Sequence, residues 1–139
     1  EIGTQVVIGL RFETGADLLQ VKWIQITRKL DLANMNLSPS TTYEIFYIVK
    51  FKVDAFGWHS APIIFMVLEN GNQMKTSEIL EPYINCPDSW HEIPGGQFTV
   101  PADKNGLVEF GMLEVATDWW KGGMVLEGVK LKPKGGMVP

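Results

Sequence analysis

The sequence predicts an all-β protein, an antiparallel β-sandwich of the jelly-roll type, and two observations support this fold class. Short segments in which apolar and polar residues alternate recur along the chain, and Pro, Gly and Asn separate them roughly every 8–12 residues. No segment has the periodicity of a helix longer than a turn or two. With 139 residues, 45% of them hydrophobic and 20% charged, we expect residues 1–139 to form a single globular domain.

The first half of the chain contains several expected strands. Alternating apolar residues over 8–12 indicate the first strand, and residues 19–28 form the second. In the third, an apolar face begins at Tyr43 and continues on every second residue to Val53, which predicts a sheet with one wet side. Residues 63–68 are apolar on both faces and predict a central strand.

The second half of the chain begins with a turn signal. Asn70-Gly71 predicts a hairpin, because both residues tolerate positive φ. Pro and Gly interrupt residues 90–98, which predicts an edge strand or a bulge. Residues 108–112 alternate in a further strand, and residues 124–132 supply the last one.

If successive strands run antiparallel, the connecting loops alternate between the two ends of the sandwich. The loops near 13–18, 54–60, 80–89 and 116–122 then share one end, and those near 29–42, 70–72 and 99–106 share the other. The first end collects Trp58, His59, Tyr83, Asn85, Trp119, Trp120 and Lys121, whereas the second collects Ser, Pro, Asn, Asp and Gly. The parity of the strands therefore predicts one aromatic end and one end made of turn residues.

Charge and composition exclude several classes of partner. The net charge of -4 argues against nucleic acid as the main partner, and no apolar run approaches the ~20 residues of a membrane-spanning helix. Cys86 is the only cysteine, so no disulfide forms within the chain, which fits a reducing compartment or a protein stabilised by its core and leaves an intermolecular bridge open. Asn36-Leu-Ser38 matches a glycosylation sequon, but Pro39 follows directly and the match carries little weight.

Catalysis is poorly supported by the residues. His59, His91 and Cys86 lack the spacing of a metal site, and no cofactor motif is present. Glu109 and Glu114 are the obvious pair of carboxylates for glycoside hydrolysis, but their odd separation places them on opposite faces of a strand. We therefore expect no enzyme activity, and Glu114, at the end of its strand, suits hydrogen bonding to a ligand better than cleavage.

The segment Thr117-Asp-Trp-Trp-Lys-Gly-Gly123 carries the clearest functional signal. Neighbouring residues of a strand point to opposite faces, so both indoles cannot enter one core, and we expect one to pack and the other to contact a ligand. A pyranose packs its C–H face on an indole, and one such stack contributes on the order of 2 kcal/mol. Exposed tryptophan also serves protein interfaces, so sugar and protein partners both remain open on this chemistry.

The other tryptophans have different expected roles. Trp23, within an apolar strand pattern, and Trp90, beside Ile93, are expected to pack in the core. For Trp58, which follows a strand after Gly57, packing and ligand contact are equally open.

A longer set of motifs resembles a known family. The motifs in order are Trp23-Ile-Gln-Ile26, Leu37-Ser-Pro-Ser-Thr-Thr-Tyr43, Gly57-Trp58, Trp90-His-Glu-Ile-Pro-Gly-Gly-Gln-Phe98, Gly106-Leu-Val-Glu-Phe110 with Glu114, and the segment from Trp120 to Lys134. Together they resemble the phloem protein 2 lectins of plants, the Nictaba-related group, over roughly residues 19–134, and are most similar to a cucurbit phloem lectin. The order and spacing of the pieces carry the resemblance.

The resemblance implies a non-catalytic jelly-roll lectin. Such a protein binds chitin oligomers and the N-acetylglucosamine core of N-glycans, forms homodimers, and occurs in the cytosol or in phloem sap with a role in plant defence. The last motif is also similar to the sugar-binding loop of glycoprotein-recognising F-box proteins, which carries over to Trp119, Trp120, Lys121 and Gly122. The family's tryptophan-rich segment near the N-terminal strand has no counterpart here, and Phe12 is its possible substitute.

The expected sugar-binding residues are therefore Trp119, Trp120, Lys121, Trp58, Glu114, Tyr83, Asn85 and Phe12. The alternative is a protein-interaction or self-assembling phloem domain that uses the same aromatic end, with Cys86 or the sheet edges as further contacts. A chitin-degrading enzyme is the third hypothesis.

Overall fold

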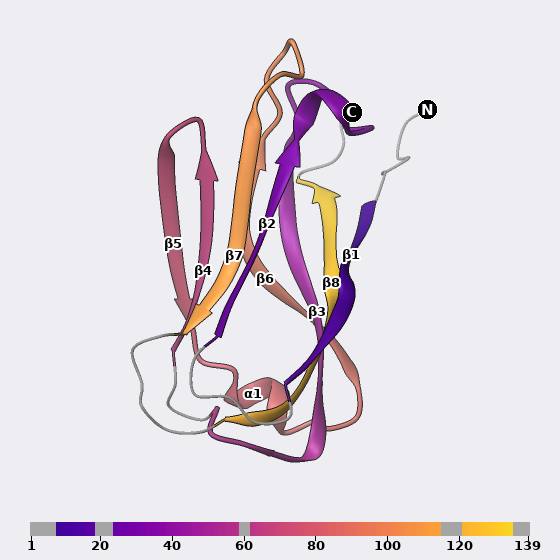
Figure 1. Ribbon diagram of the computed structural model, residues 1–139, viewed down its shortest axis with the longest axis vertical. Helices are drawn as coiled ribbons and strands as arrows, with labels where there is room; N and C mark the ends of the chain where they lie inside the picture. The colour runs from indigo at the N-terminus through magenta and orange to yellow at the C-terminus, as the bar shows by residue number, and fades with distance from the viewer. Residues whose placement is uncertain (1–7, 19–23, 59–61, 115–120, 135–139) are drawn as a thin grey trace.

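Eight strands form two four-stranded antiparallel sheets that face each other in the computed structural model of the chain (Figure 1). The structure describes residues 8–18, 24–58, 62–114 and 121–134. One sheet has the order β1-β8-β3-β6 and the other β2-β7-β4-β5. The strands are β1 (Ile8–Leu18), β2 (Ile24–Asp31), β3 (Thr42–Phe56), β4 (Ile63–Glu69), β5 (Asn72–Glu78), β6 (Trp90–Thr99), β7 (Leu107–Glu114) and β8 (Gly122–Pro133).

The strand pairing is that of a jelly roll. β4 pairs with β5, β3 with β6, β2 with β7 and β1 with β8, all antiparallel. The four strand pairs are nested around the turn between β4 and β5. The chain therefore has the topology of one long hairpin that is folded over into two sheets. The predicted fold class is confirmed.

The turn at the centre of this roll is Asn70-Gly71. Asn70 has a φ of 51° and Gly71 a φ of 81°, and positive φ at both central residues is the condition for a two-residue hairpin that matches the twist of its strands. β4 lies between β7 and β5, so the prediction of a central strand at residues 63–68 is also confirmed.

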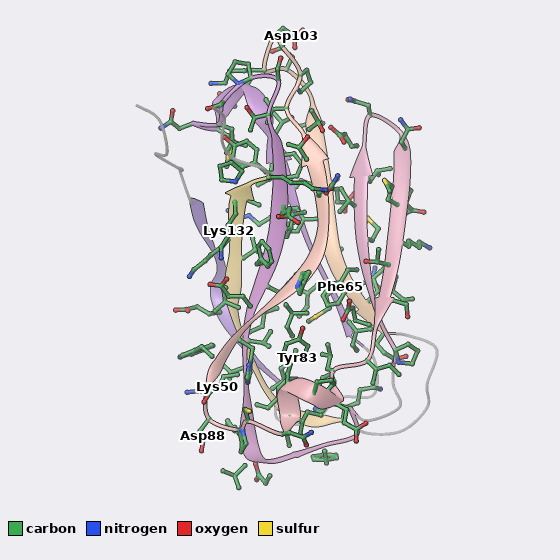
Figure 2. All side chains as sticks on the ribbon, turned by 180° about the vertical axis from the view of Figure 1, so that it is seen from behind. Lys50, Phe65, Tyr83, Asp88, Asp103 and Lys132 are labelled. Atoms are coloured by element: carbon green, nitrogen blue, oxygen red, sulfur yellow. The ribbon has the colours of Figure 1, made fainter. Side chains whose placement is uncertain are left out.

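The core fills the space between the two sheets. Tyr43, Ile45, Tyr47, Val49 and Phe51 alternate along β3 and are all buried, and Phe65 of β4 meets them from the opposite sheet (Figure 2). The alternation stops after Phe51, where the pairing of β3 with β8 skips to Phe56.

Two predictions about strand ends are wrong. Val53, expected on the buried face of β3, is 76% exposed because it lies within the unpaired part of that strand. Residues 13–18, expected to form a loop, belong to β1, which continues to Leu18. The register of β1 against β8 shifts between Arg11 and Ala16, so the Thr-Gly pair at 14–15 forms an irregularity within the strand instead of a connection.

Helical structure is limited to short connections. The 3-10 helix η1 (Leu32–Asn34) follows β2, and the α-helix α1 (Glu81–Ile84) precedes β6. Among the described residues, no helix has the length and apolar character to cross a membrane. The expectation of no helix beyond a turn or two holds for the described part of the chain.

The connections lie at the two ends predicted from strand parity. Residues 32–41, 70–71 and 100–106 gather at one end, which we call the turn end (Figure 1). Residues 57–58, 79–89 and 121–122 gather at the other, which we call the aromatic end. Figure 2 marks the turn end with Asp103 and the aromatic end with Tyr83 and Asp88.

Candidate functional site

The aromatic end contains a buried ion pair. The Nζ atom of Lys121 lies 2.8 Å from Oε1 of Glu114, and the two side chains are 0% and 1% exposed. Glu114 is the last residue of β7, and Lys121 directly precedes β8. The pair therefore joins the two ends of the segment 115–120. Because a buried charge without a partner is strongly destabilising, each residue fixes the position of the other.

Trp58 holds Gly122, the residue that follows Lys121, in place. Its indole is fully buried, packs edge-on against Phe51 with ring centroids 5.6 Å apart, and donates a hydrogen bond of 2.8 Å from Nε1 to the carbonyl of Gly122. Of the two roles left open for Trp58, the structure supports packing. The bond also joins the connection after β3 to the start of β8, as the loop grouping predicts.

Gly123 brings β8 close to β3 at this point. It has a φ of 82°, and a Cβ atom placed on it would come within 2.6 Å of the Ala55 Cα. Only glycine accommodates both the backbone conformation and this contact. Gly123 therefore allows the close approach of the two strands.

Tyr83 and Asn85 lie at the same end, on and after α1. Tyr83 is half-buried, and its ring packs edge-on against His91 with centroids 5.5 Å apart. Burial raises the pKa of Tyr83, and the negative charge of Glu78 raises it further. Asn85 is exposed, so its amide is accessible to a polar ligand.

The structure describes the remaining predicted site residues only in part or not at all. Trp119 and Trp120 lie outside the described residues, as does His59. Phe12 belongs to β1, but only its backbone is described. Of the predicted set, the structure thus brings together Trp58, Glu114 and Lys121 in the interior, and places Tyr83 and Asn85 nearer to the surface.

Trp90 corrects the expectation that it packs in the core. Its side chain is 48% exposed on the outer face of β6, with the Lys50 Nζ atom 4.8 Å from the ring centroid. Ile93, by contrast, is fully buried. The odd separation of the two residues already places them on opposite faces of a strand, so the sequence contained this signal. Trp23 lies outside the described residues.

The described side chains do not form a metal site. Within residues 25–58, 62–114 and 121–134, no group of three or more His, Cys, Asp or Glu side chains is arranged to hold an ion. His91 instead donates from Nε2 to the carbonyl oxygen of Cys86 at 3.0 Å, and the Cys86 side chain is exposed.

Comparison with known proteins identifies the family of this chain. The family model described as "Phloem protein 2" matches residues 5–133. Protein PHLOEM PROTEIN 2-LIKE A2 of Arabidopsis thaliana is 33% identical over 123 residues, which cover 86% of this chain and 60% of that protein. PHLOEM PROTEIN 2-LIKE A1 of the same plant is 34% identical over 118 residues, covering 84% of this chain and 47% of that protein.

The chain thus spans about half the length of these two relatives. Among solved structures, the Podospora anserina GH26-CBM35 β-(1,4)-mannanase aligns with 97% of this chain and 29% of its own, at a TM-score of 0.46 and 11% identity. The family model covers nearly the whole chain, in agreement with the motifs and the strand order. This chain therefore belongs to the phloem protein 2 family.

Proposed function

We propose that the chain is a non-catalytic lectin that binds oligomers of β-1,4-linked N-acetylglucosamine and the chitobiose core of N-glycans. The observation that supports this most directly is the buried Glu114–Lys121 pair at the base of the segment that contains Trp119 and Trp120. A rigid base reduces the conformational entropy that a binding segment loses when it captures its ligand.

In this proposal the residues of the aromatic end divide into two groups. Trp119 and Trp120 supply the apolar surface on which a sugar ring stacks, and Asn85 and Tyr83 supply hydrogen bonds from the neighbouring connection. Glu114, Lys121 and Trp58 act beneath them, because all three are buried and hold residues 121–122 in place. Phe12 would add a further contact on the side of β1.

One sugar ring gives only weak binding. A stack that removes about 80 Å² of apolar surface contributes on the order of 2 kcal/mol, and the cost of association leaves a site of roughly millimolar affinity. We therefore propose that several rings are bound in a row, or that a homodimer presents two sites to one glycan.

The test is retention on chitin. Trp120→Ala is expected to abolish retention while thermal unfolding stays unchanged. Trp90→Ala is the matched control, because it removes an exposed indole from the outer face of β6. Calorimetry with N-acetylglucosamine oligomers of increasing length should show affinity that rises with length. Normal retention of the Trp120 variant, or its loss in both variants, would refute the assigned site.

A protein-interaction domain is the second candidate, and the exposed thiol of Cys86 at the aromatic end favours it. A glycan array separates the two. If no glycan gives a signal while the protein self-associates with rising concentration, and Cys86→Ser reduces that association, the interaction domain replaces the lectin. Shortened products after incubation with chitotetraose would instead indicate an enzyme.

A further inference from the structure

A groove lies between the two sheets along one open side of the sandwich. It has a volume of about 340 Å³ and is lined by residues of β3, β4, β5 and β6, among them Phe65, Val67, Met74, Thr76, Glu78 and Gly96. This volume falls within the range of small-molecule sites, which begin at roughly 300 Å³. None of the residues proposed to bind sugar belongs to the groove.

The groove exists because β5 extends one sheet beyond the edge of the other. Met74, Thr76 and Glu78 pair with Val67, Phe65 and Ile63 of β4, and directly paired residues point to the same face of a sheet. The β4 residues are buried against the opposite sheet, whose edge strand is β6. β6 packs more against β4 than against β5, so part of the inner face of β5 is left open.

Close packing between β4 and β6 forms the back of the groove. Gly96 has a φ of 109°, and a Cβ atom on it would lie 2.7 Å from the Val67 Cγ2 atom. The neighbouring Gly95 similarly lies against the Tyr47 ring. The two glycines let β6 approach the core closely, and Phe65 and Val67 form an apolar floor of the groove beside β5.

The lining combines this apolar floor with negative charge. Ile45, Phe65 and Val67 are buried, whereas Met74 is 65% exposed. The lining includes Glu44 and Glu78 but no Lys, Arg or His. Both glutamates are half-buried, and within the described part of the chain neither has an ion-pair partner. A partly enclosed carboxylate that lacks a counter-charge favours a cationic ligand.

We propose that this groove binds a small organic cation, with an apolar body over Phe65, Val67 and Met74 and an ammonium group directed to Glu78. The apolar body removes the exposed Met74 side chain from water, and the ammonium supplies the missing counter-charge. This site is separate from the proposed sugar site and does not depend on it.

An added β-strand fits this place less well than a small molecule. The free edge of β6 is interrupted by Pro94, which has no N–H group, and by the register shift opposite Glu44 to Phe46. Such interruptions are a common way in which edge strands avoid pairing with another chain. A continuous backbone ladder along β6 is therefore not available to a peptide or to a second copy.

The experiment compares matched probes by NMR of methionine methyl groups, with the Met74 signal assigned from a Met74→Leu variant. The probes are 4-phenylbutylammonium, 4-phenylbutanol and 4-phenylbutanoate, which share an apolar body and differ in charge. We expect the ammonium compound to shift the Met74 methyl signal saturably and to bind about tenfold more tightly than the carboxylate.

Variants test separately whether the charge of Glu78 and the space of the groove are needed for binding. Glu78→Gln should weaken binding of the ammonium compound about tenfold, whereas Glu109→Gln, which changes another half-buried glutamate on the outer face of the same sheet, should not. Thr76→Trp should fill the groove and abolish binding of all three probes.

Equal affinity for ammonium and carboxylate, equal effects of the two glutamate variants, or undiminished binding to the Thr76 variant would each overturn the proposal. Retention on chitin should be the same in wild type and in Thr76→Trp, so the failure of this site is distinguishable from the failure of the proposed lectin.

Discussion

The two ends of the sandwich are stabilised in different ways. At the turn end, short-range contacts organise the chain: Asp31 accepts hydrogen bonds from the Ala33 amide at 3.2 Å and the Asn34 side chain at 2.8 Å, and Asp103 accepts one from the Asn105 amide at 3.0 Å. Backbone bonds such as Ser40 to Val100 then join neighbouring connections.

At the aromatic end, buried side chains make the connections. The Glu114–Lys121 pair spans seven residues of sequence, and the bond from Trp58 to Gly122 spans 64. Contacts of this kind form only after distant strands have paired, so their loss should propagate from one connection to another. At the turn end, local side-chain contacts therefore shape single connections before backbone bonds join them, whereas the buried side-chain contacts of the aromatic end depend on the completed fold.

The largest effect should follow from breaking the buried ion pair. Lys121→Met or Glu114→Leu removes one partner of this buried ion pair, and we expect each to lower the free energy of unfolding by about 3–5 kcal/mol. Denaturant unfolding measures the loss. The double variant removes both charges and should lose much less than the sum of the two single losses. Additive losses would show that the two side chains do not act as a pair.

A smaller effect should distinguish the two described tryptophans. Trp58→Phe removes a hydrogen bond, leaves the carbonyl of Gly122 without that donor and opens space in the core, so we expect a loss of about 2–3 kcal/mol. Trp90→Phe changes a half-exposed ring over Lys50 and should cost less than about 1 kcal/mol. Similar losses in thermal unfolding would contradict the burial of one indole and the exposure of the other.

At the turn end, Gly71→Ala tests local conformation alone. A Cβ atom at this position meets nothing within 4 Å, so the expected loss of about 1 kcal/mol comes from the positive φ of 81°. Chitin retention should be unchanged, because the turn lies at the end opposite the proposed site. Reduced retention at unchanged stability would show that the two ends are coupled.

The smallest effect at neutral pH should come from Tyr47, midway between the two ends. Its hydroxyl is buried and, among the described residues, has no hydrogen-bond partner, so Tyr47→Phe should be neutral or stabilise the fold by up to about 1 kcal/mol.

The same residue predicts a pH dependence. Burial raises the pKa of Tyr47 above its ordinary value of 10.0, so the folded state disfavours ionisation. This contribution to stability is complete below pH 10 and is lost progressively as the pH rises further, by about 1.4 kcal/mol per pH unit. Tyr47→Phe should therefore resist unfolding at pH 11 better than wild type. Identical alkaline unfolding curves would count against the buried neutral phenol.

Much of this fold is readable from local sequence. The alternation along β3, the continuous apolar run of β4 and the Asn70-Gly71 turn follow local rules. Counting strands also assigned the described connections to the two ends, apart from residues 13–18, which belong to β1. The wrong predictions concern places where strand pairing is irregular. β1 contains turn-forming residues at its register shift, and Val53 lies in the part of β3 that does not pair with β8. Local preference does not report the register of a distant strand.

For the candidate site, residue type predicted a place, which stays a prediction, but not which of its side chains are buried. Aromatic and charged residues around position 120 marked the aromatic end, because exposed indoles and turn residues are typical of binding segments. Whether Lys121 faces solvent or Glu114, and whether Trp58 faces a ligand or Gly122, depends on groups that are brought together only when the strands pair.

The sequence by itself determined the strand content, the central hairpin turn and the family, because alternation, turn chemistry and motif spacing are properties of neighbouring residues. Only the tertiary structure decided that Trp58, Glu114 and Lys121 are buried supports and that β5 overhangs β6 to leave a groove. Both results depend on how far one sheet extends over the other and on which side chains meet across them. Whether a side chain is buried depends on the packing of the whole domain, so it cannot be determined from one segment alone.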